Sequence, residues 1–173
     1  MKTQIIVQAR LSSKRLPKKV LKKITGKYLI DYLIERLQRV NNANFAIATS
    51  SEPTDDAISN YCKDHNISCF RGSLKNVSKR MLDAATFYNA NYFVRINGDS
   101  PLIDSAIIEH GINIFVNGNY DLVTNVFPRS YPIGHSVEVI RTSSFKIAYN
   151  KMFEDDHFEH ITRYYYENSS DFK

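Results

Sequence analysis

Short apolar runs alternate along the chain with longer segments in which apolar residues recur every three or four positions. The short runs are rich in β-branched residues, as strands are, and the longer segments have the period of amphipathic helices. The expected strands are residues 5–7, 45–48, 67–70, 92–96, 119–124 and 136–140. The expected helices are residues 29–40, 77–88, 104–117 and 154–168, with two more that begin near residue 53 and at Thr142. This alternation predicts a doubly wound α/β fold.

The first expected strand leads into a loop rich in cations and hydroxyl groups, residues 9–19, which we call the basic loop. Ser12 and Ser13 supply the hydroxyl groups, and Pro17 stiffens the end of the loop. Its cations are Arg10, Lys14, Arg15, Lys18 and Lys19. Clustered cations often mark only a solvated surface. Because ligands of open α/β sheets bind beyond the carboxyl ends of strands, where this loop lies, we favour an anion site.

The positive charge is concentrated at the amino-terminal end of the chain. The net charge is +5, and residues 1–30 contain nine of the 23 Lys and Arg residues and no acid. The rest of the chain therefore carries 14 cations against 18 acids, a net charge of −4. A nucleic-acid surface would need a broader basic footprint, so the pattern favours a specific anionic ligand and no nucleic acid.

The composition is that of one folded domain, residues 1–173. A hydrophobic content of 43% with 12% aromatic residues excludes a disordered chain. Cys62 and Cys69 form no C-x-x-C pair, and the amino terminus has no signal-peptide core. No apolar run approaches the roughly 20 residues that span a bilayer. We therefore expect a soluble, cytoplasmic protein that does not bind membranes.

A single carboxylate follows the expected strand 92–96. Gly98 permits close approach of the backbone to a ligand, and Asp99 then points out of the carboxyl end of the sheet, where the basic loop also lies. Mg²⁺ prefers one or two carboxylates and completes its coordination with phosphate oxygens and water. Together these features predict a nucleoside triphosphate bound with Mg²⁺. Turn preferences alone leave open that Asp99 only caps the turn.

Two other regions offer candidate residues. The segment that begins at residue 154 is rich in acids and histidines, and a transition-metal site there is an alternative to a solvated helix start. Its ligands would come from Glu154, Asp155, Asp156, His157, Glu159 and His160, with the two histidines on one helical face. His135 lies in a loop shaped by Pro and Gly, and both an acceptor contact and an ordinary loop role stay open. We expect the tyrosines at 164–166 to pack or to form an interface rather than to stack on bases.

Five segments that span nearly the whole chain form a recognisable set. They are QARLSSKRLPKKVL at 8–21, RGS at 71–73 followed by Val77 and Arg80, RINGDSPLID at 95–104, VEV at 137–139 and EHIT at 159–162. Together they resemble the sugar nucleotidyltransferases of the cytidylyltransferase type, which include the CMP-Kdo and CMP-acylneuraminate synthetases. The resemblance is strongest to the branch of spore coat polysaccharide biosynthesis.

The resemblance implies a three-layer α/β fold of the nucleotide-diphospho-sugar transferase type, similar to GT-A, with a mixed, mainly parallel sheet. CTP would lie above the carboxyl ends of the strands. The residues expected to hold the triphosphate are Arg10, Ser12, Ser13, Arg15 and Lys19, with Arg71, Ser73 and Arg80 near the nucleotide. Lys19, Arg10 and Asp99 would be catalytic, and Asp99 would hold Mg²⁺. His135 and Glu138 are expected on the acceptor side.

The chain also departs from the family pattern. Members continue into a Val-Asp-x-Pro type segment whose Asp is a second metal ligand, and this sequence ends at Lys173. We therefore expect one nucleotidyltransferase domain without that segment, in which Asp121 or Glu138 replaces the ligand only if the fold brings it near Asp99. Arg163 stands where the family pattern has proline.

The expected activity is transfer of CMP from CTP to a sugar or sugar acid for surface polysaccharides, with release of pyrophosphate. One alternative is a glycosyltransferase that uses a nucleotide-sugar donor. The other is a nucleotide-binding remnant or subunit without its own turnover. The resemblance also implies a homodimer, for which the aromatic carboxyl-terminal helix is the candidate interface.

Overall fold

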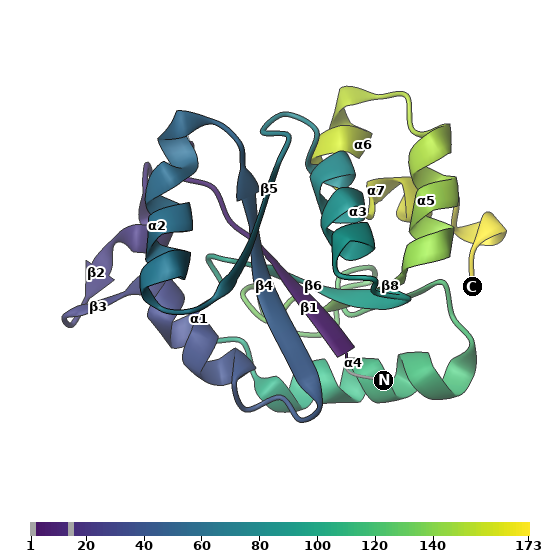
Figure 1. Cartoon of the computed structure of the whole chain (residues 1–173). Helices are drawn as coiled ribbons and strands as arrows, with labels where there is room; N and C mark the ends of the chain where they lie inside the picture. The colour runs from purple at the N-terminus through teal and green to yellow at the C-terminus, as the bar shows by residue number, and fades with distance from the viewer. Residues whose placement is uncertain (1–2, 14–15) are drawn as a thin grey trace.

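A mixed sheet runs through the middle of the molecule (Figure 1). The structure is a computed structural model that describes residues 3–13 and 16–173, and in these residues six strands form the sheet in the order β5-β4-β1-β6-β8-β7. They are β1 (Thr3–Gln8), β4 (Ala43–Ser50), β5 (Ser68–Gly72), β6 (Tyr92–Asn97), β7 (Leu122–Thr124) and β8 (Glu138–Arg141). Only β8 runs against its neighbours, so the predicted mainly parallel mixed sheet is confirmed.

Helices cover both faces of this sheet and complete the predicted three layers (Figure 1). One face packs against α1 (Leu29–Leu37), α2 (Asp56–Asp64) and α4 (Ser105–Gly118). The other face packs against α3 (Val77–Phe87), α5 (Thr142–Lys151), α6 (Asp155–Glu159) and α7 (Arg163–Glu167). The remaining elements are a hairpin of β2 (Lys23–Ile24) and β3 (Lys27–Tyr28), and the 3-10 turns η1 (Lys19–Leu21), η2 (Pro53–Asp55) and η3 (Ser169–Asp171).

The first strand is apolar throughout because it is covered on both faces. Ile5 and Val7 lie in the core beneath α1, α2 and α4, whereas Ile6 points into the core beneath α3 and α5. All three side chains are fully buried. Since β1 pairs in parallel with β4 and β6, the basic loop leaves from the middle of the carboxyl edge of the sheet. This position is the one that open α/β sheets use for ligands.

The helix that follows β6 begins as predicted. Asp104 caps α4, and its Oδ1 accepts a hydrogen bond from the Ala106 N–H at 2.9 Å. Ile103 and Ile108, the predicted staple, are both fully buried. The turn after β6 is therefore fixed on its far side by a capped and anchored helix.

Three predicted boundaries were wrong. The segment 154–168 is two short helices, α6 and α7, because the chain leaves helical geometry at His160 (φ −113°, ψ 87°) and then buries Ile161. Thr142 does not cap α5, since it is the first helical residue and its hydroxyl donates to the Ala90 carbonyl at 2.6 Å. The strand β5 continues to Gly72, whereas the sequence predicted its end before Arg71.

Within the described residues, no helix combines the length and apolar character needed to cross a membrane. The tyrosines of the last helix pack as expected: Tyr164 and Tyr165 are buried against α3 and α5. Cys62, on α2, is fully buried in the core on the opposite face.

Candidate active site

A large cleft of about 1100 Å³ opens at the carboxyl edge of the sheet. One side is formed by the end of β1, the basic loop and η1, and by residues 74–76 after β5. The other side is formed by β6 and the turn after it, the loop between β7 and β8, and α6. The basic loop and the turn with Asp99 were predicted to face one another, and both line this cleft.

Two ion pairs connect the basic loop with acids of the cleft. Lys19 forms an ion pair with Asp99, which lies in the turn after β6. Arg10 Nη2 lies 2.6 Å from Oε1 of Glu159 on α6. All four groups are partly exposed, so an incoming anion or cation can compete for each of them. The cations predicted to hold phosphate are thus within reach of a cleft ligand.

The backbone on either side of β1 fixes the start of the basic loop. The Ala9 N–H donates to the Ala48 carbonyl at 3.2 Å, and the Gly98 N–H donates to the Gln8 carbonyl at 2.8 Å. A Cβ on Gly98 would lie 3.0 Å from both Ala9 Cβ and the Gln8 carbonyl oxygen. The close approach that Gly98 permits is therefore to the chain itself, where the sequence had suggested a ligand.

The hydroxyl residues of the basic loop lie where they were expected. Ser12 and Ser13 line the cleft, and Ser13 Oγ accepts a weak hydrogen bond from the Leu16 N–H at 3.5 Å. Arg15, the remaining predicted phosphate ligand, lies outside the described residues. Lys18 has a positive φ of 57°, and its N–H donates to the Leu11 carbonyl at 3.0 Å. This bond folds the loop back before Lys19.

Arg71, Ser73 and Arg80, the residues of β5, α3 and their connection that were predicted near the nucleotide, do not belong to the described cleft lining. Arg71 donates to the carbonyls of Ser50 and Glu52 at 2.9 and 3.0 Å. Its Nη2 also lies 2.7 Å from Asp56 Oδ1. Ser73 Oγ accepts from the Asn76 N–H at 3.0 Å. In the described part of the chain the cleft here is lined by residues 74–76, and Arg71 and Ser73 hold the backbone around them.

Arg80 is a fully buried cation with incomplete hydrogen bonding. One guanidinium nitrogen donates to the Ser73 carbonyl, while Nε and Nη2 have no partner among the described residues. Burial, and then the charge of Arg10, lower the pKa of Arg80 to about 10, with Asp55 acting in the opposite direction. It therefore stays charged at neutral pH. Unpaired buried donors are costly, and an anion close to Arg10 and Arg80 would reduce that cost.

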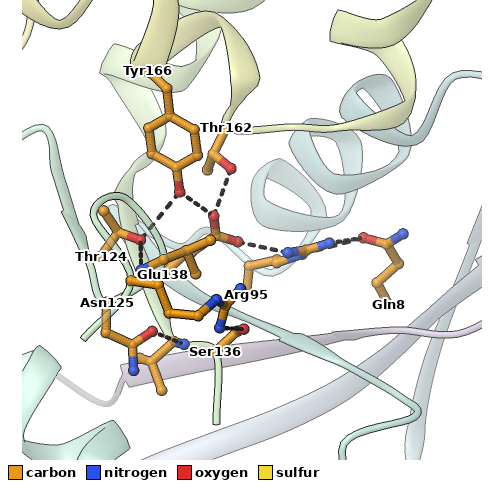
Figure 2. Close-up of polar contacts among 11 residues, drawn as sticks. Gln8, Arg95, Thr124, Asn125, Ser136, Glu138, Thr162 and Tyr166 are labelled. Carbon is orange, nitrogen blue, oxygen red and sulfur yellow. Dashed lines mark hydrogen bonds and ion pairs between the residues drawn. The ribbon is translucent and has the colours of Figure 1, made fainter. Parts of the chain in front are cut away.

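A buried carboxylate, Glu138, organises the other side of the cleft (Figure 2). It is 1% exposed. Its oxygens accept from Arg95 Nη1 at 2.7 Å, from Thr162 Oγ1 at 2.5 Å and from the Tyr166 hydroxyl at 2.7 Å. Burial by itself would raise the pKa of Glu138, but the charge of Arg95 and these hydrogen bonds outweigh burial and hold the pKa below its ordinary value. Glu138 was predicted to contact the acceptor, yet its oxygens are already occupied by protein groups.

Arg95 connects this network to the cleft, which both Arg95 and Gln8 line. Its Nε and Nη2 donate to Gln8 Oε1 at 3.3 and 3.1 Å, so Glu138 and Gln8 fix the guanidinium from two sides (Figure 2). Arg129 and Ser136 line the same side, and Arg129 Nη1 donates to Ser136 Oγ at 3.3 Å. Sequence reasoning missed Arg95 and Arg129, although a cation inside an apolar strand was a usable sign for Arg95.

His135 lies next to these residues without lining the cleft in the described chain. Its carbonyl accepts from Asn125 Nδ2 at 2.7 Å, and its N–H donates to the Pro132 carbonyl. Its ring Nδ1 is buried and has no partner in the part of the chain that the structure describes. The neighbouring Ser136 is the residue that reaches the cleft. The predicted acceptor contact of His135 therefore stays a prediction.

The cluster at the start of α6 differs from the expected arrangement. His157 is buried and its Nε2 lies 2.7 Å from Glu167 Oε2, whereas His160 ends the helix and lines the cleft. The two histidines do not share one helical face, so that expectation was wrong. Among the described residues, the side chains with ligand spacing are Glu154, His157 and Glu167, whose ligand atoms lie within 4.8 Å of one another.

Asp99, the predicted metal ligand, lies in the cleft. Asp99 and the Asn97 amide lie at the end of β6 in the cleft, and both offer the oxygen ligands that Mg²⁺ prefers. Neither Asp121 nor Glu138, the predicted replacements for a second ligand, belongs to the described cleft lining. Asp121 instead lies 3.8 Å from Arg141 Nε. The acids that do share the cleft with Asp99 are Asp155 and Glu159.

The sequence profile of the family described as "Cytidylyltransferase" matches residues 4–173. The chain belongs to this cytidylyltransferase family. The match covers all five segments on which the resemblance was based, so the predicted family is confirmed.

Two proteins are similar to this chain along most of its length. The spore coat polysaccharide biosynthesis protein SpsF of Bacillus subtilis is 28% identical over 166 residues, which cover 92% of this chain and 68% of that protein. A cytidylyltransferase structure from Leptospira borgpetersenii serovar Hardjo-bovis has a TM-score of 0.92 at 33% identity. It covers 99% of this chain and 74% of the Leptospira chain.

A second structure shows the fold alone. It is CMP:2-keto-3-deoxy-manno-octonic acid synthetase complexed with CTP, with a TM-score of 0.71 at 16% identity. The alignment covers 98% of this chain and 87% of that chain. The predicted nucleotidyltransferase fold is thereby confirmed.

Proposed function

We propose that this protein transfers CMP from CTP to a sugar or sugar-acid acceptor and releases pyrophosphate, in the synthesis of surface polysaccharide. The observation that carries the proposal is the cleft at the carboxyl ends of β1 and β6, in which Arg10 and Lys19 lie opposite Asp99. A cytidylyltransferase needs cations for a triphosphate and a carboxylate for a metal ion in one place. The basic loop and the turn after β6 supply both.

The basic loop is the proposed triphosphate site. Arg10 and Lys19 would exchange their carboxylate partners, Glu159 and Asp99, for phosphate oxygens, and Ser12 and Ser13 would add hydroxyl donors. Charge-assisted bonds to phosphate are among the strongest hydrogen bonds in proteins. The unpaired donors of the buried Arg80 support the proposal, because they increase the positive potential behind Arg10.

Asp99 is the proposed Mg²⁺ ligand. When bound, Mg²⁺ would neutralise phosphate charge at the reacting centre. Of the residues in this chain, Asp99 and Asn97 have the oxygen chemistry to hold it. The ion pair between Asp99 and Lys19 keeps the carboxylate in the cleft and close to the proposed phosphate site.

The acceptor would bind on the side of the cleft formed by Arg95, Arg129 and Ser136. Two cations on this side suit an acceptor with a carboxylate, such as a sugar acid. Arg95 is held by Glu138 and Gln8, so it presents a fixed guanidinium rather than a mobile one. A preorganised contact of this kind positions the acceptor at little entropic cost.

In the proposed reaction an acceptor oxygen attacks the α-phosphorus of CTP. The new oxygen–phosphorus bond forms as the bond to the bridging oxygen breaks, and the electron pair leaves with pyrophosphate. The proton of the acceptor hydroxyl passes to solvent water. The protein forms no covalent bond, so its contribution is positioning and neutralisation of charge. Lys19 and Arg10 would stabilise the charge that develops on the phosphates.

The test is detection of pyrophosphate by ³¹P NMR in mixtures of the protein, CTP, Mg²⁺ and a panel of sugar acids. The proposal predicts pyrophosphate only when CTP and a suitable acceptor are both present. In a parallel mixture that contains a nucleotide sugar in place of CTP, release of free nucleotide would instead identify a glycosyltransferase. Binding of CTP without pyrophosphate across the panel would support the nucleotide-binding subunit and contradict the proposed turnover.

A further inference from the structure

A buried carboxylate that the mechanism above does not use lies beneath the basic loop. Asp55 is the last residue of η2 and is fully buried. Its Oδ1 accepts from the Leu11 N–H at 2.7 Å. Its Oδ2 accepts from the Ser50 N–H at 3.2 Å and from Ser50 Oγ at 2.5 Å. One side chain therefore joins the basic loop to the end of β4.

The position of Asp55 in the chain predicts a different role. It occupies the N-cap position of α2, where an Asp side chain usually accepts from a backbone N–H of the first turn. Asp55 makes no such bond. Its carboxylate reaches instead to Leu11, 44 residues away in the sequence. The cap position is thus used for a tertiary contact with the basic loop.

Leu11 is the point at which this contact controls the loop. It lies between Arg10 and Ser12, which both line the cleft, and its own side chain is buried in the core. Its carbonyl accepts from the Lys18 N–H at 3.0 Å, directly before Lys19. Because both backbone groups of Leu11 are bonded, its orientation sets the position of the loop on either side.

The charge of Asp55 also acts on Arg80. Burial and the charge of Arg10 lower the pKa of Arg80, and Asp55 partly offsets them. The two oxygens of the Asp55 side chain accept from Leu11 and from Ser50 separately, so the carboxylate holds both segments at once.

We infer that Asp55 is a positioning residue of the triphosphate site, whose buried carboxylate fixes the basic loop at Leu11 and so sets where Arg10, Ser12 and Lys19 meet the phosphates. This inference rests on the proposed function, in which the basic loop binds the triphosphate of CTP. It adds a residue that touches no ligand and acts through the backbone of the loop.

Asp55→Asn is the most informative variant, with Asp55→Ala beside it. An amide has one oxygen, so it can accept from the backbone N–H of Leu11 or of Ser50 but not from both with separate oxygens. Asp56→Asn is the matched control, because Asp56 is the next residue, is exposed and pairs with Arg71. Ser50→Ala removes only the hydroxyl bond and gives a milder change if the Asp55 variants fold poorly.

The experiment measures the affinity and the stoichiometry of two probes, CTP and inorganic tripolyphosphate, by calorimetric titration. The inference predicts that Asp55→Asn raises the Kd of both probes by about tenfold, as loss of supporting contacts does at other sites, with stoichiometry unchanged. Amide hydrogen exchange at Leu11 should become faster in Asp55→Asn and stay as in the wild type in Asp56→Asn. A fall in stoichiometry at constant Kd would show a purely structural role and overturn the inference.

Failure of the proposed function gives a different result. Wild-type protein that binds tripolyphosphate but not CTP would contradict the cytidylyltransferase proposal and leave the effect of Asp55 on the loop measurable. Wild-type protein that binds neither probe would contradict both. Normal binding of both probes by Asp55→Asn, with normal exchange at Leu11, would overturn the role of Asp55 alone.

Discussion

The proposed nucleotide and acceptor sides of the cleft hold their cations in different ways. On the nucleotide side, Lys19 and Arg10 pair with the partly exposed acids Asp99 and Glu159. On the acceptor side, Arg95 pairs with Glu138, which is 1% exposed and also bonded to Thr162 and Tyr166. Exposed pairs exchange partners at little cost, whereas a buried pair resists separation. The nucleotide side is thus built to change partners, and the acceptor side to stay fixed.

The largest expected effect is on turnover, from the nucleotide side. Lys19→Ala should reduce pyrophosphate release by about 100-fold or more, since charge stabilisation near a transition state has effects of that size. The free energy of unfolding should change little, because the ion pair with Asp99 is partly exposed. Pyrophosphate release measured beside Lys22→Ala, an exposed lysine three positions on, checks this. Turnover near the wild-type rate would remove Lys19 from the mechanism.

The next largest effect is expected on stability, when the buried ion pair of the proposed acceptor side is broken. Glu138→Gln should lower the free energy of unfolding by about 3 kcal/mol, because it leaves a partly buried Arg95 without its charged partner. Urea unfolding measures this loss. Glu35→Gln, which breaks the exposed pair with Lys27, should be close to neutral. Equal small losses in both variants would contradict the distinction between a fixed and an exchangeable side.

The same buried pair predicts a pH dependence. The pKa of Glu138 lies below its ordinary value of 4.5 in the folded protein, so the unfolded chain takes up the proton first as the pH falls. The stabilisation is therefore complete above about pH 4.5 and is lost as the pH falls through the folded pKa. The free energy of unfolding, measured between about pH 6 and about pH 3 where carboxyl groups titrate, should therefore depend less on pH in Glu138→Gln than in the wild type.

A smaller effect is expected for the exposed cation of the acceptor side. Arg129→Ala should raise the KM for a sugar-acid acceptor by about tenfold, the effect of one charged hydrogen bond, with kcat nearly unchanged. Steady-state kinetics with the acceptor varied at saturating CTP measures both constants. Arg39→Ala, an exposed arginine outside the described cleft lining, is the control. An unchanged KM would place the acceptor elsewhere in the cleft.

The smallest effect on KM is expected for Glu159, the carboxylate that Arg10 would exchange for phosphate. Glu159→Gln should lower the KM for CTP by about threefold, because an exposed ion pair contributes up to about 1 kcal/mol. Asp83→Asn, which breaks an exposed pair with Lys79, should leave this KM unchanged. A higher KM in Glu159→Gln would show that Glu159 holds Arg10 in its binding position and does not compete with phosphate.

Local patterns predicted most of the fold and the meeting of the basic loop with Asp99. The apolar run at 5–7 indicated a strand covered on both faces, and the rule for carboxyl ends of strands placed Lys19 and Asp99 together. The break between α6 and α7 was not predicted, since it accompanies the burial of Ile161 in the core and a hydrogen bond of Thr162 to Glu138, 24 residues away. A helical pattern alone contains no information about such a partner.

The residues that support the site were missed for the same reason. Asp55 has the local pattern of a helix cap, and only the fold brings it to Leu11. Glu138 looks like an exposed acid of an alternating strand until the fold brings Arg95, Thr162 and Tyr166 to it. Residues that touch a ligand leave a charge pattern in the sequence, whereas residues that position them are defined by tertiary neighbours.

The most direct test of the central claim follows the α-phosphate of CTP. The protein is incubated with Mg²⁺, a sugar-acid acceptor and CTP that carries a radioactive label at the α-phosphorus, and the products are separated by anion exchange. If the protein is a cytidylyltransferase, the label should move into a CMP-linked sugar in the same amount as the pyrophosphate released. Lys19→Ala should prevent this transfer. Label that stays in CTP with every sugar acid tested, or that appears only as free CMP, would contradict the account.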